Sequence, residues 1–141
     1  MNNDGSSQGA DDTPTRAIVA GHGEFAAGII SAVAQITGRE DVFVAMTNRD
    51  LGADAITQQM RTHLDETGSR VIFTDLPAGS CTVAARRLMR ERPGLVLVTG
   101  ANLATLLDFV FHGEAPPVEA ANHAVDKGRA SLTVLGAPGA R

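Results

Sequence analysis

A histidine between two glycines has the setting in this chain that most favours chemistry. The apolar residues 17–20 lead directly into Gly21-His22-Gly23, and a further apolar stretch begins at Phe25. Neither glycine has a side chain to cover the ring of His22, and a glycine backbone can approach an anion closely. The helix expected after this turn points its unpaired amides and the positive end of its dipole at the same place. An accessible imidazole beside an anion site predicts phosphoryl chemistry on His22.

A carboxylate and a hydroxyl are expected beside this histidine. Asp75 ends another apolar stretch, and Ser80 follows it after a short turn. A carboxylate on Nδ1–H fixes the tautomer of a histidine and leaves Nε2 as the nucleophile, and we assign that role to Asp75. The hydroxyl of Ser80, with the amides of Gly23, Ala78, Gly79 and Ser80, is predicted to hold phosphoryl oxygens. The predicted catalytic residues are therefore His22, Asp75 and Ser80.

Short apolar runs alternate with helical patterns along the chain. The expected strands, 17–20, 42–46, 70–75, 95–98 and 131–135, are mostly continuous in apolar character, which is typical of strands covered on both faces. The expected helices are 25–37, 54–66, 80–92, 102–111 and 117–127, and most of them stop at a glycine. This alternation predicts an α/β fold with an open, mostly parallel sheet and helices on both faces.

In such sheets, ligands gather beyond the carboxyl ends of the strands, where the strand order reverses. His22 comes just after the first expected strand, and Asp75 closes the third. If these two strands are neighbours, as in flavodoxin-like order, His22 and Asp75 face one another across the crevice.

Three segments of the chain carry a family resemblance: residues 18–23, 75–85 and 100–107. They resemble the enzyme IIA domains of the mannose family of the bacterial phosphoenolpyruvate:sugar phosphotransferase system (PTS). The resemblance covers roughly residues 16 to 135, and Gly21-His22-Gly23 followed by Glu-Phe-Ala is similar to the amino-sugar, N-acetylgalactosamine-type branch.

The resemblance implies a fold, a reaction and partners. The fold implied is four parallel strands in the order 2-1-3-4, plus an antiparallel C-terminal strand, here 131–135, exchanged between the subunits of a homodimer. The reaction implied is a phosphotransferase reaction in which His22 accepts a phosphoryl group from phospho-HPr and passes it to a IIB component for sugar uptake. Asp75 and Ser80 match the family's site residues, and no cofactor is implied.

Two positions depart from the family pattern, which usually has Gly-Gly-Ser-Pro where this chain has Ala78-Gly79-Ser80-Cys81. Alanine restricts a loop position at which the family's glycine allows positive φ. Cysteine leaves the expected first helical position without the preset φ of proline. We expect both departures to be tolerated, with consequences for rate and partner fit.

Two other functions stay open for a chain of this pattern. One is the phosphocarrier subunit of a dihydroxyacetone kinase, whose IIA domain shares this fold and histidine. The other is a regulatory module that binds an anion or a partner without transfer. A response-regulator receiver is disfavoured, because its acidic metal-binding cluster is missing after the first strand. A flavodoxin is disfavoured because the chain has no Trp or Tyr to stack on a flavin.

The composition restricts the classes of partner and the cellular compartment that we expect for this protein. The formal net charge is -4, and no run of Lys or Arg supplies a patch for nucleic acid. A single cysteine excludes an intrachain disulfide and suits a reducing cytosol. No apolar run is long enough to cross a bilayer, so we expect a cytoplasmic protein without membrane insertion. Residues 1–14 are predicted to be a disordered tail, and residues 15–141 the phosphocarrier domain.

The remaining histidines have structural interpretations. His63 is interpreted as solvated on a polar helix, and His112 as a residue whose partial positive charge suits a helix end. His123 has no evident partner in the sequence. No pair of histidines has the spacing of a metal site, so no metal is predicted.

Other reactive or charged side chains also have simple interpretations. Cys81 is interpreted as a small buried residue, since no adjacent base would activate its thiol. Ser80 is also a candidate helix N-cap. Glu24 and Arg49 are placed at the edge of the site. A basic cluster at Arg86, Arg87, Arg90 and Arg92 is interpreted as a solvated helix face, with an acidic partner as the weaker alternative.

Overall fold

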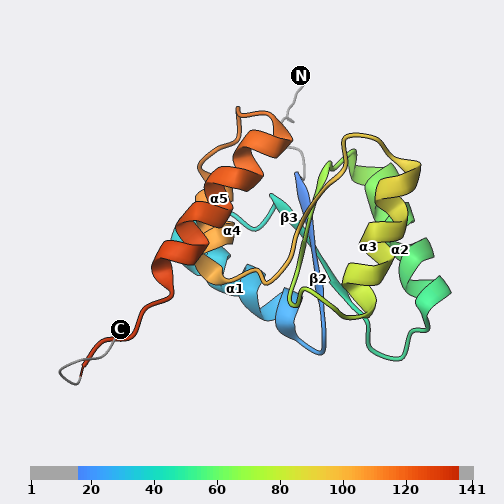
Figure 1. Ribbon diagram of the computed structural model, residues 1–141, viewed down its shortest axis with the longest axis horizontal. Coiled ribbons are helices and arrows are strands. Elements are labelled where there is room, and N and C mark those ends of the chain that lie inside the picture. The colour runs from blue at the N-terminus through green and yellow to red at the C-terminus, as the bar shows by residue number, and fades with distance from the viewer. Residues whose placement is uncertain (1–15, 137–141) are drawn as a thin grey trace.

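The computed structural model in Figure 1 describes residues 16–136. Its elements are β2 (Ala17–Gly21), α1 (Phe25–Thr37), β3 (Phe43–Thr47), α2 (Ala53–Thr67), β4 (Val71–Thr74), α3 (Ser80–Glu91), β5 (Val96–Val98), α4 (Leu103–Val110) and α5 (Pro117–Ser131). The predicted tail, residues 1–14, lies outside the described residues. Within residues 16–136, no helix is both long enough and apolar enough to traverse a lipid bilayer.

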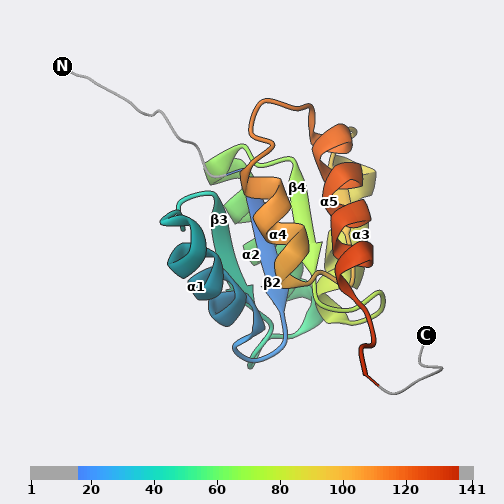
Figure 2. The same cartoon turned by 90° about the vertical axis from the view of Figure 1, so that its left-hand side faces the viewer.

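The four strands form one sheet in the order β3-β2-β4-β5, and all neighbouring pairs are parallel. This confirms the predicted α/β fold and the order 2-1-3-4 for the parallel strands. Helices α1, α4 and α5 cover one face of the sheet, and α2 and α3 cover the other (Figures 1 and 2).

Successive strand residues enter opposite layers of the core. Val19 and Phe73 pack toward α1, α4 and α5, whereas Ile18 and Ile72 pack toward α2 and α3. All four side chains are buried. Because both faces are covered, the strands contain apolar residues at consecutive positions, as the sequence pattern indicates.

Helix α5 is longer than predicted. The expected end before Gly128 is wrong, because α5 continues to Ser131. A Cβ on Gly128 would lie 2.2 Å from Cγ2 of Thr105, so this glycine allows α5 to pack closely on α4. The carbonyl of Gly128 also accepts a hydrogen bond from Nδ2 of Asn102 at 3.0 Å. Asn102 is the N-cap of α4 and forms a capping box with Thr105.

The segment after α5 does not join the sheet within one chain. Residues 132–136 form no strand in the described part of the chain, and they extend away from the body of the molecule (Figure 1). The apolar side chains of Leu132, Val134 and Leu135 are exposed. The predicted C-terminal strand at 131–135 is therefore not formed in the single chain, and its exchange between subunits stays a prediction.

Candidate active site

The carboxyl ends of β2 and β4 bring two of the predicted site residues together. These strands are parallel neighbours, and Ala20 pairs with Thr74 in their register. The chain therefore leaves both strands at the same edge of the sheet, where Gly21 leads into His22 and Thr74 into Asp75. The juxtaposition expected from flavodoxin-like strand order is present.

Asp75 holds His22 by two hydrogen bonds to a single oxygen. Nδ1 of the imidazole lies 2.8 Å from Oδ2 of Asp75, and the backbone N–H of His22 donates to the same oxygen at 2.9 Å. A carboxylate oxygen only accepts, so this Nδ1 carries a proton. The lone pair of Nε2 is left for a substrate, and the His22 side chain is 53% exposed. Nε2 of His22 can therefore act as a nucleophile.

The surroundings of Asp75 favour its ionised form. Its side chain is only 14% exposed, and burial alone raises the pKa of a carboxyl group. The two hydrogen bonds from His22 and the charge of its ring outweigh burial, so the pKa of Asp75 falls below its ordinary value of 3.8. A negative charge behind the ring can stabilise the positive charge that develops when Nε2 forms a bond.

Two glycines make room for this pair. A Cβ on Gly21 would lie 2.8 Å from Oδ2 of Asp75 and 2.8 Å from Cδ2 of Phe25. Gly79 has a φ of 148°, and a Cβ there would lie 3.4 Å from Cε1 of His22. The missing side chain at Gly21 therefore leaves room for the carboxylate of Asp75. The missing side chain at Gly79 lets the loop between β4 and α3 pass close to the ring of His22.

Two buried threonines fix the loop between β4 and α3. Oγ1 of Thr82 donates to the carbonyl of Leu76 at 2.6 Å and lies 2.7 Å from Oγ1 of Thr74. Both threonines are buried. Their hydrogen bonds link the end of β4 to the first turn of α3, so the loop that follows Asp75 is held at both ends. Thr74 and Thr82 are absent from the predicted site, and their role becomes visible only once β4 and α3 are packed.

Ser80 begins α3 but does not cap it. The N-cap is Gly79, so the interpretation of Ser80 as a helix cap is wrong. Oγ of Ser80 instead accepts a hydrogen bond from Nδ2 of Asn48 at 2.8 Å. In accepting this bond, the hydroxyl can still use its own proton as a donor, which a phosphoryl oxygen requires.

Asn48 is absent from the predicted site. It follows directly after β3, the strand beside β2, and its backbone N–H donates to the carbonyl of Gly21 at 3.1 Å. This position is the one signal that could have identified it, because the carboxyl ends of parallel neighbours share one edge of the sheet. Asn48 connects the Gly21 turn to the start of α3.

The departures from the family pattern cause no backbone strain. Ala78 is exposed and has no positive φ, so it needs none of the freedom of glycine. Cys81 is the second residue of α3 rather than the first, so the expected loss of a preset φ at the first helical position does not occur. The amides of Gly23, Ala78 and Gly79 stay predicted phosphate donors.

The thiol of Cys81 is unsuited to nucleophilic chemistry. Cys81 is buried, and burial, together with the negative charge of Asp75, raises its pKa to about 11. Such a thiol stays protonated at neutral pH. The interpretation of Cys81 as a buried structural residue is confirmed.

Charged residues lie at the edge of the site, as expected. Arg49 forms an ion pair with Glu24, with Nη1 and Oε2 2.9 Å apart. Its guanidinium also lies beside Gly23, where a Cβ would be 3.5 Å from Nη2. Arg86, Arg87 and Arg90 are exposed on α3, as predicted, and line a groove with Pro77, Ala78, Thr82 and Val83. The prediction is wrong for Arg92, which follows the end of α3, is half-buried and forms an ion pair with Asp65.

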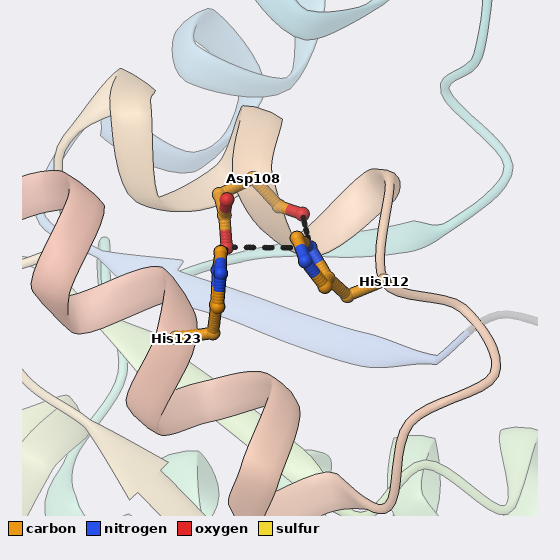
Figure 3. A group of neighbouring side chains, drawn as sticks. All are labelled: Asp108, His112 and His123. Carbon is orange, nitrogen blue, oxygen red and sulfur yellow. Dashed lines mark hydrogen bonds and ion pairs between the residues drawn. The ribbon is translucent and has the colours of Figure 1, made fainter.

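The structure also brings His112 and His123 together beside Asp108 (Figure 3). Nδ1 of His123 lies 2.8 Å from Oδ2 of Asp108, so the view that His123 lacks a partner is wrong. The ring centroids of His112 and His123 are 4.0 Å apart. Asp108 and His112 are four residues apart, a spacing at which helical side chains meet, but no local pattern points to His123. His63 is half-buried on α2 rather than solvated.

Residues 16–126 match the family model EIIA-man, described as the PTS system fructose IIA component. Among curated sequences, none matches this chain at a significant level.

Solved structures of low sequence identity share the fold. The mannose/sorbose-specific IIA subunit of the phosphotransferase system from Enterococcus faecalis has a TM-score of 0.76 at 23% identity, over 89% of this chain and 97% of that one. Component EIIA from Streptococcus agalactiae has a TM-score of 0.78 at 18% identity, over 84% and 95%. The PTS IIA protein associated with the fucose utilization operon from Streptococcus pneumoniae has a TM-score of 0.73 at 20% identity, over 84% and 91%.

Proposed function

The chain belongs to the EIIA-man family of PTS IIA components, and from this premise we propose that it carries a phosphoryl group on Nε2 of His22. Membership of the family implies phosphotransferase activity in general. The observation that supports the specific proposal is an exposed imidazole whose Nδ1 is held by the carboxylate of Asp75. The pair also follows the carboxyl ends of two neighbouring parallel strands, the place where sheets of this kind bind their ligands.

The proposed reaction is an exchange of one bond to phosphorus for another. Nε2 of His22 attacks the phosphorus of phospho-HPr, and the bond from phosphorus to HPr breaks as the new P–N bond forms. The proton on Nδ1 stays between the ring and Asp75, whose negative charge offsets the positive charge on the imidazole. The phosphoryl group then moves from His22 to a IIB component, and the imidazole returns to its starting form.

The neighbouring groups are proposed to hold the phosphoryl oxygens during both transfers. The N-terminus of α3 and the amides of Gly23, Ala78 and Gly79 supply partial positive charge and donors. The hydroxyl of Ser80 adds a donor, and Asn48 fixes that hydroxyl by its 2.8 Å hydrogen bond. Phosphoryl transfer needs little from a protein beyond such positioning and charge stabilisation.

We further propose that the protein acts as a homodimer in which residues 132–136 pair with β5 of a second copy. β5 is an edge strand, bonded only to β4 within the described chain. Such an edge presents unpaired N–H and C=O groups that can accept a further strand. The exposed Leu132, Val134 and Leu135 would be covered by the same pairing.

The assay that tests the proposed function is phosphorylation with purified components. The chain is incubated with phosphoenolpyruvate, enzyme I and HPr, and its intact mass is measured. We expect a gain of one acid-labile phosphoryl group in the wild type and none in His22→Ala. His63→Ala is the matched control, because it removes a histidine outside the site, and it should be labelled like the wild type.

The outcomes separate the proposal from its alternatives. Labelling that persists in His22→Ala would move the phosphoryl group to another residue and overturn the assignment. An absence of labelling with a compatible HPr, combined with tight binding of phosphate analogues, would instead identify a regulatory module that binds without transfer.

A further inference from the structure

We propose that Asp108, His112 and His123 form a binding site for a divalent transition-metal ion of the zinc type (Figure 3). Asp108 belongs to α4, His112 to the turn after it and His123 to α5, two helices that pack against one another. Each residue offers one ligand atom, and these atoms all lie within 4.8 Å of one another. The cluster thus joins three potential metal ligands across one helix–helix contact.

The cluster is separate from the His22 site. α4 starts after the carboxyl end of β5 and leads back toward the amino end of β2, where a Cβ on Gly113 would lie 3.4 Å from Nη1 of Arg16. His112 is the residue before Gly113, so the cluster lies toward the end of the sheet opposite His22. A metal bound here would not contact the phosphoryl group proposed for His22.

The donor set suits zinc and its transition-metal neighbours. Two imidazoles and one carboxylate, with water in a fourth position, are a common ligand set for Zn²⁺. Mg²⁺ and Ca²⁺ prefer oxygen ligands alone, so the two imidazoles select against them.

The distances are close to those a bound ion requires. In a tetrahedral site with bonds of about 2.0–2.1 Å, neighbouring ligand atoms are about 3.3 Å apart. Oδ2 of Asp108 lies 2.8 Å from Nδ1 of His123 and 3.5 Å from Nδ1 of His112. Small rotations of the two side chains would bring both pairs to the required separation. For His112, the rotation turns Nδ1 from the carbonyl oxygen of Asp108 toward its carboxylate.

The protonation states allow binding without a net loss of protons from the rings. Nδ1 of His112 lies 2.8 Å from the carbonyl oxygen of Asp108, and Nδ1 of His123 lies 2.8 Å from its carboxylate, so each Nδ1 carries a proton without metal. To bind through Nδ1, each neutral imidazole moves its proton to Nε2 by exchange with solvent. The hydrogen bond from His112 to the carbonyl is lost, and the two metal–nitrogen bonds replace these contacts.

The three side chains differ in burial, so that the carboxylate is shielded from solvent while the two imidazoles can be reached from it. The side chain of Asp108 is 9% exposed, whereas those of His112 and His123 are 33% and 46% exposed. A shielded carboxylate attracts a cation more strongly than a solvated one. The exposed rings leave the fourth position open to water, through which the ion can enter.

The experiment is a metal titration of the full chain without an affinity tag. Co²⁺ binding is followed by its visible absorption, and Zn²⁺ binding by calorimetry. We expect one ion per chain, and an affinity lowered at least ~100-fold in His123→Asn and in Asp108→Asn, since even residues that only support metal ligands cost about 10–100-fold when replaced. His63→Asn and His22→Asn, which alter histidines outside the cluster, should bind the ion like the wild type.

Thermal unfolding provides the second measurement. Zn²⁺ should raise the unfolding midpoint of the wild type and leave that of His123→Asn unchanged, because an ion that binds only the folded state stabilises it. His123 is half exposed, so its replacement tests the site even if Asp108→Asn does not fold. The proposal is overturned if no ion binds, if binding survives in His123→Asn, or if it is lost in His63→Asn or His22→Asn.

Discussion

A single oxygen of Asp75 binds His22 at two points, its backbone N–H at 2.9 Å and its Nδ1 at 2.8 Å. The first bond fixes the turn, and the second fixes the ring and its tautomer. Asp75→Asn keeps the shape of the side chain but removes its charge, so Nε2 becomes a weaker nucleophile and the wrong tautomer is populated.

We expect Asp75→Asn to lower the initial rate of His22 phosphorylation by about 10²–10⁴-fold, the range in which charge and tautomer effects of this kind fall. The rate is measured by quenching the labelling reaction at early times and determining the intact mass. Asp126→Asn, a matched change of an exposed carboxylate on α5, should react like the wild type. A rate for Asp75→Asn within twofold of the wild type would contradict the assigned role.

The lowered pKa of Asp75 makes part of the folding stability dependent on pH. Hydrogen bonds and charge from His22 lower the pKa in the folded state below the ordinary value of 3.8. A depressed folded-state pKa contributes stability that is present in full above 3.8 and is lost as the pH falls through the lowered value.

The free energy of unfolding of the wild type should therefore fall more steeply on acidification below pH 3.8 than that of Asp75→Asn. Urea unfolding at a series of pH values measures both. Parallel acid profiles for the two proteins would show that Asp75 contributes nothing through its charge.

Gly79 is the loop position at which a side chain is expected to be harmful. Gly79→Ala would place a Cβ at a φ of 148° and 3.4 Å from Cε1 of His22. We expect a loss of about 1–3 kcal/mol in the free energy of unfolding, the usual cost of a non-glycine residue in such a conformation, together with slower labelling because the ring is displaced.

Ala78→Gly is the matched change one residue earlier. Because Ala78 has no positive φ, restoring the family's glycine should relieve no strain, and added chain flexibility should cost about 0.4–1 kcal/mol. Urea unfolding distinguishes the two variants. A gain of stability in Ala78→Gly would show that the departure from the family pattern does strain this loop.

Ser80 and Asn48 are predicted to act as a unit through their 2.8 Å hydrogen bond. Removing the hydroxyl in Ser80→Ala should lower the phosphorylation rate on the order of 10²-fold, as loss of one positioned donor does. Asn48→Ala should have a smaller effect, because it frees the hydroxyl without removing it.

The double variant provides the decisive comparison for this pair. Since Asn48 acts through Ser80, adding Asn48→Ala to Ser80→Ala should lower the rate little further. Fully additive effects in the double-mutant cycle would mean that Asn48 contributes independently of Ser80.

The sheet and the central pair of the site could be predicted because each depends on a local signal. Consecutive apolar residues indicate buried parallel strands, and alternation with helices indicates their connection. Once β2 and β4 are neighbours, the residues that follow them must meet, so His22 and Asp75 come together whatever the details of the side chains.

The contacts that could not be predicted join helices or loops distant in the chain. The glycine at 128 looks like a helix stop, yet it lies within α5, because Thr105 of α4 leaves no room for a side chain. His123 meets Asp108 only through the same packing. Asn48 reaches Ser80 only when β3 and α3 are placed on the sheet. No periodic pattern in the sequence encodes the rotation of one helix against another.

The C-terminal segment provides the last prediction, because its apolar side chains have no cover within one chain. Leu132 is 84% exposed and Leu135 is 89% exposed, and the edge strand β5 has one side unpaired within the described chain. If residues 132–136 pair with β5 of a second copy, a charge at Leu135 would have to be buried in that interface. Leu135→Asp should therefore weaken the dimer, because an unpaired charge is costly to bury.

Sedimentation measures this effect directly. The wild type should sediment at twice the monomer mass of 14.6 kDa, and Leu135→Asp at low concentration should sediment at the monomer mass. Ile36→Asp is the matched control, since Ile36 is an exposed apolar residue on α1, which packs on β3 at the edge of the sheet far from β5. If strand exchange holds the dimer together, Ile36→Asp stays dimeric while Leu135→Asp dissociates. If the wild type is monomeric at every concentration, the proposed dimer is contradicted.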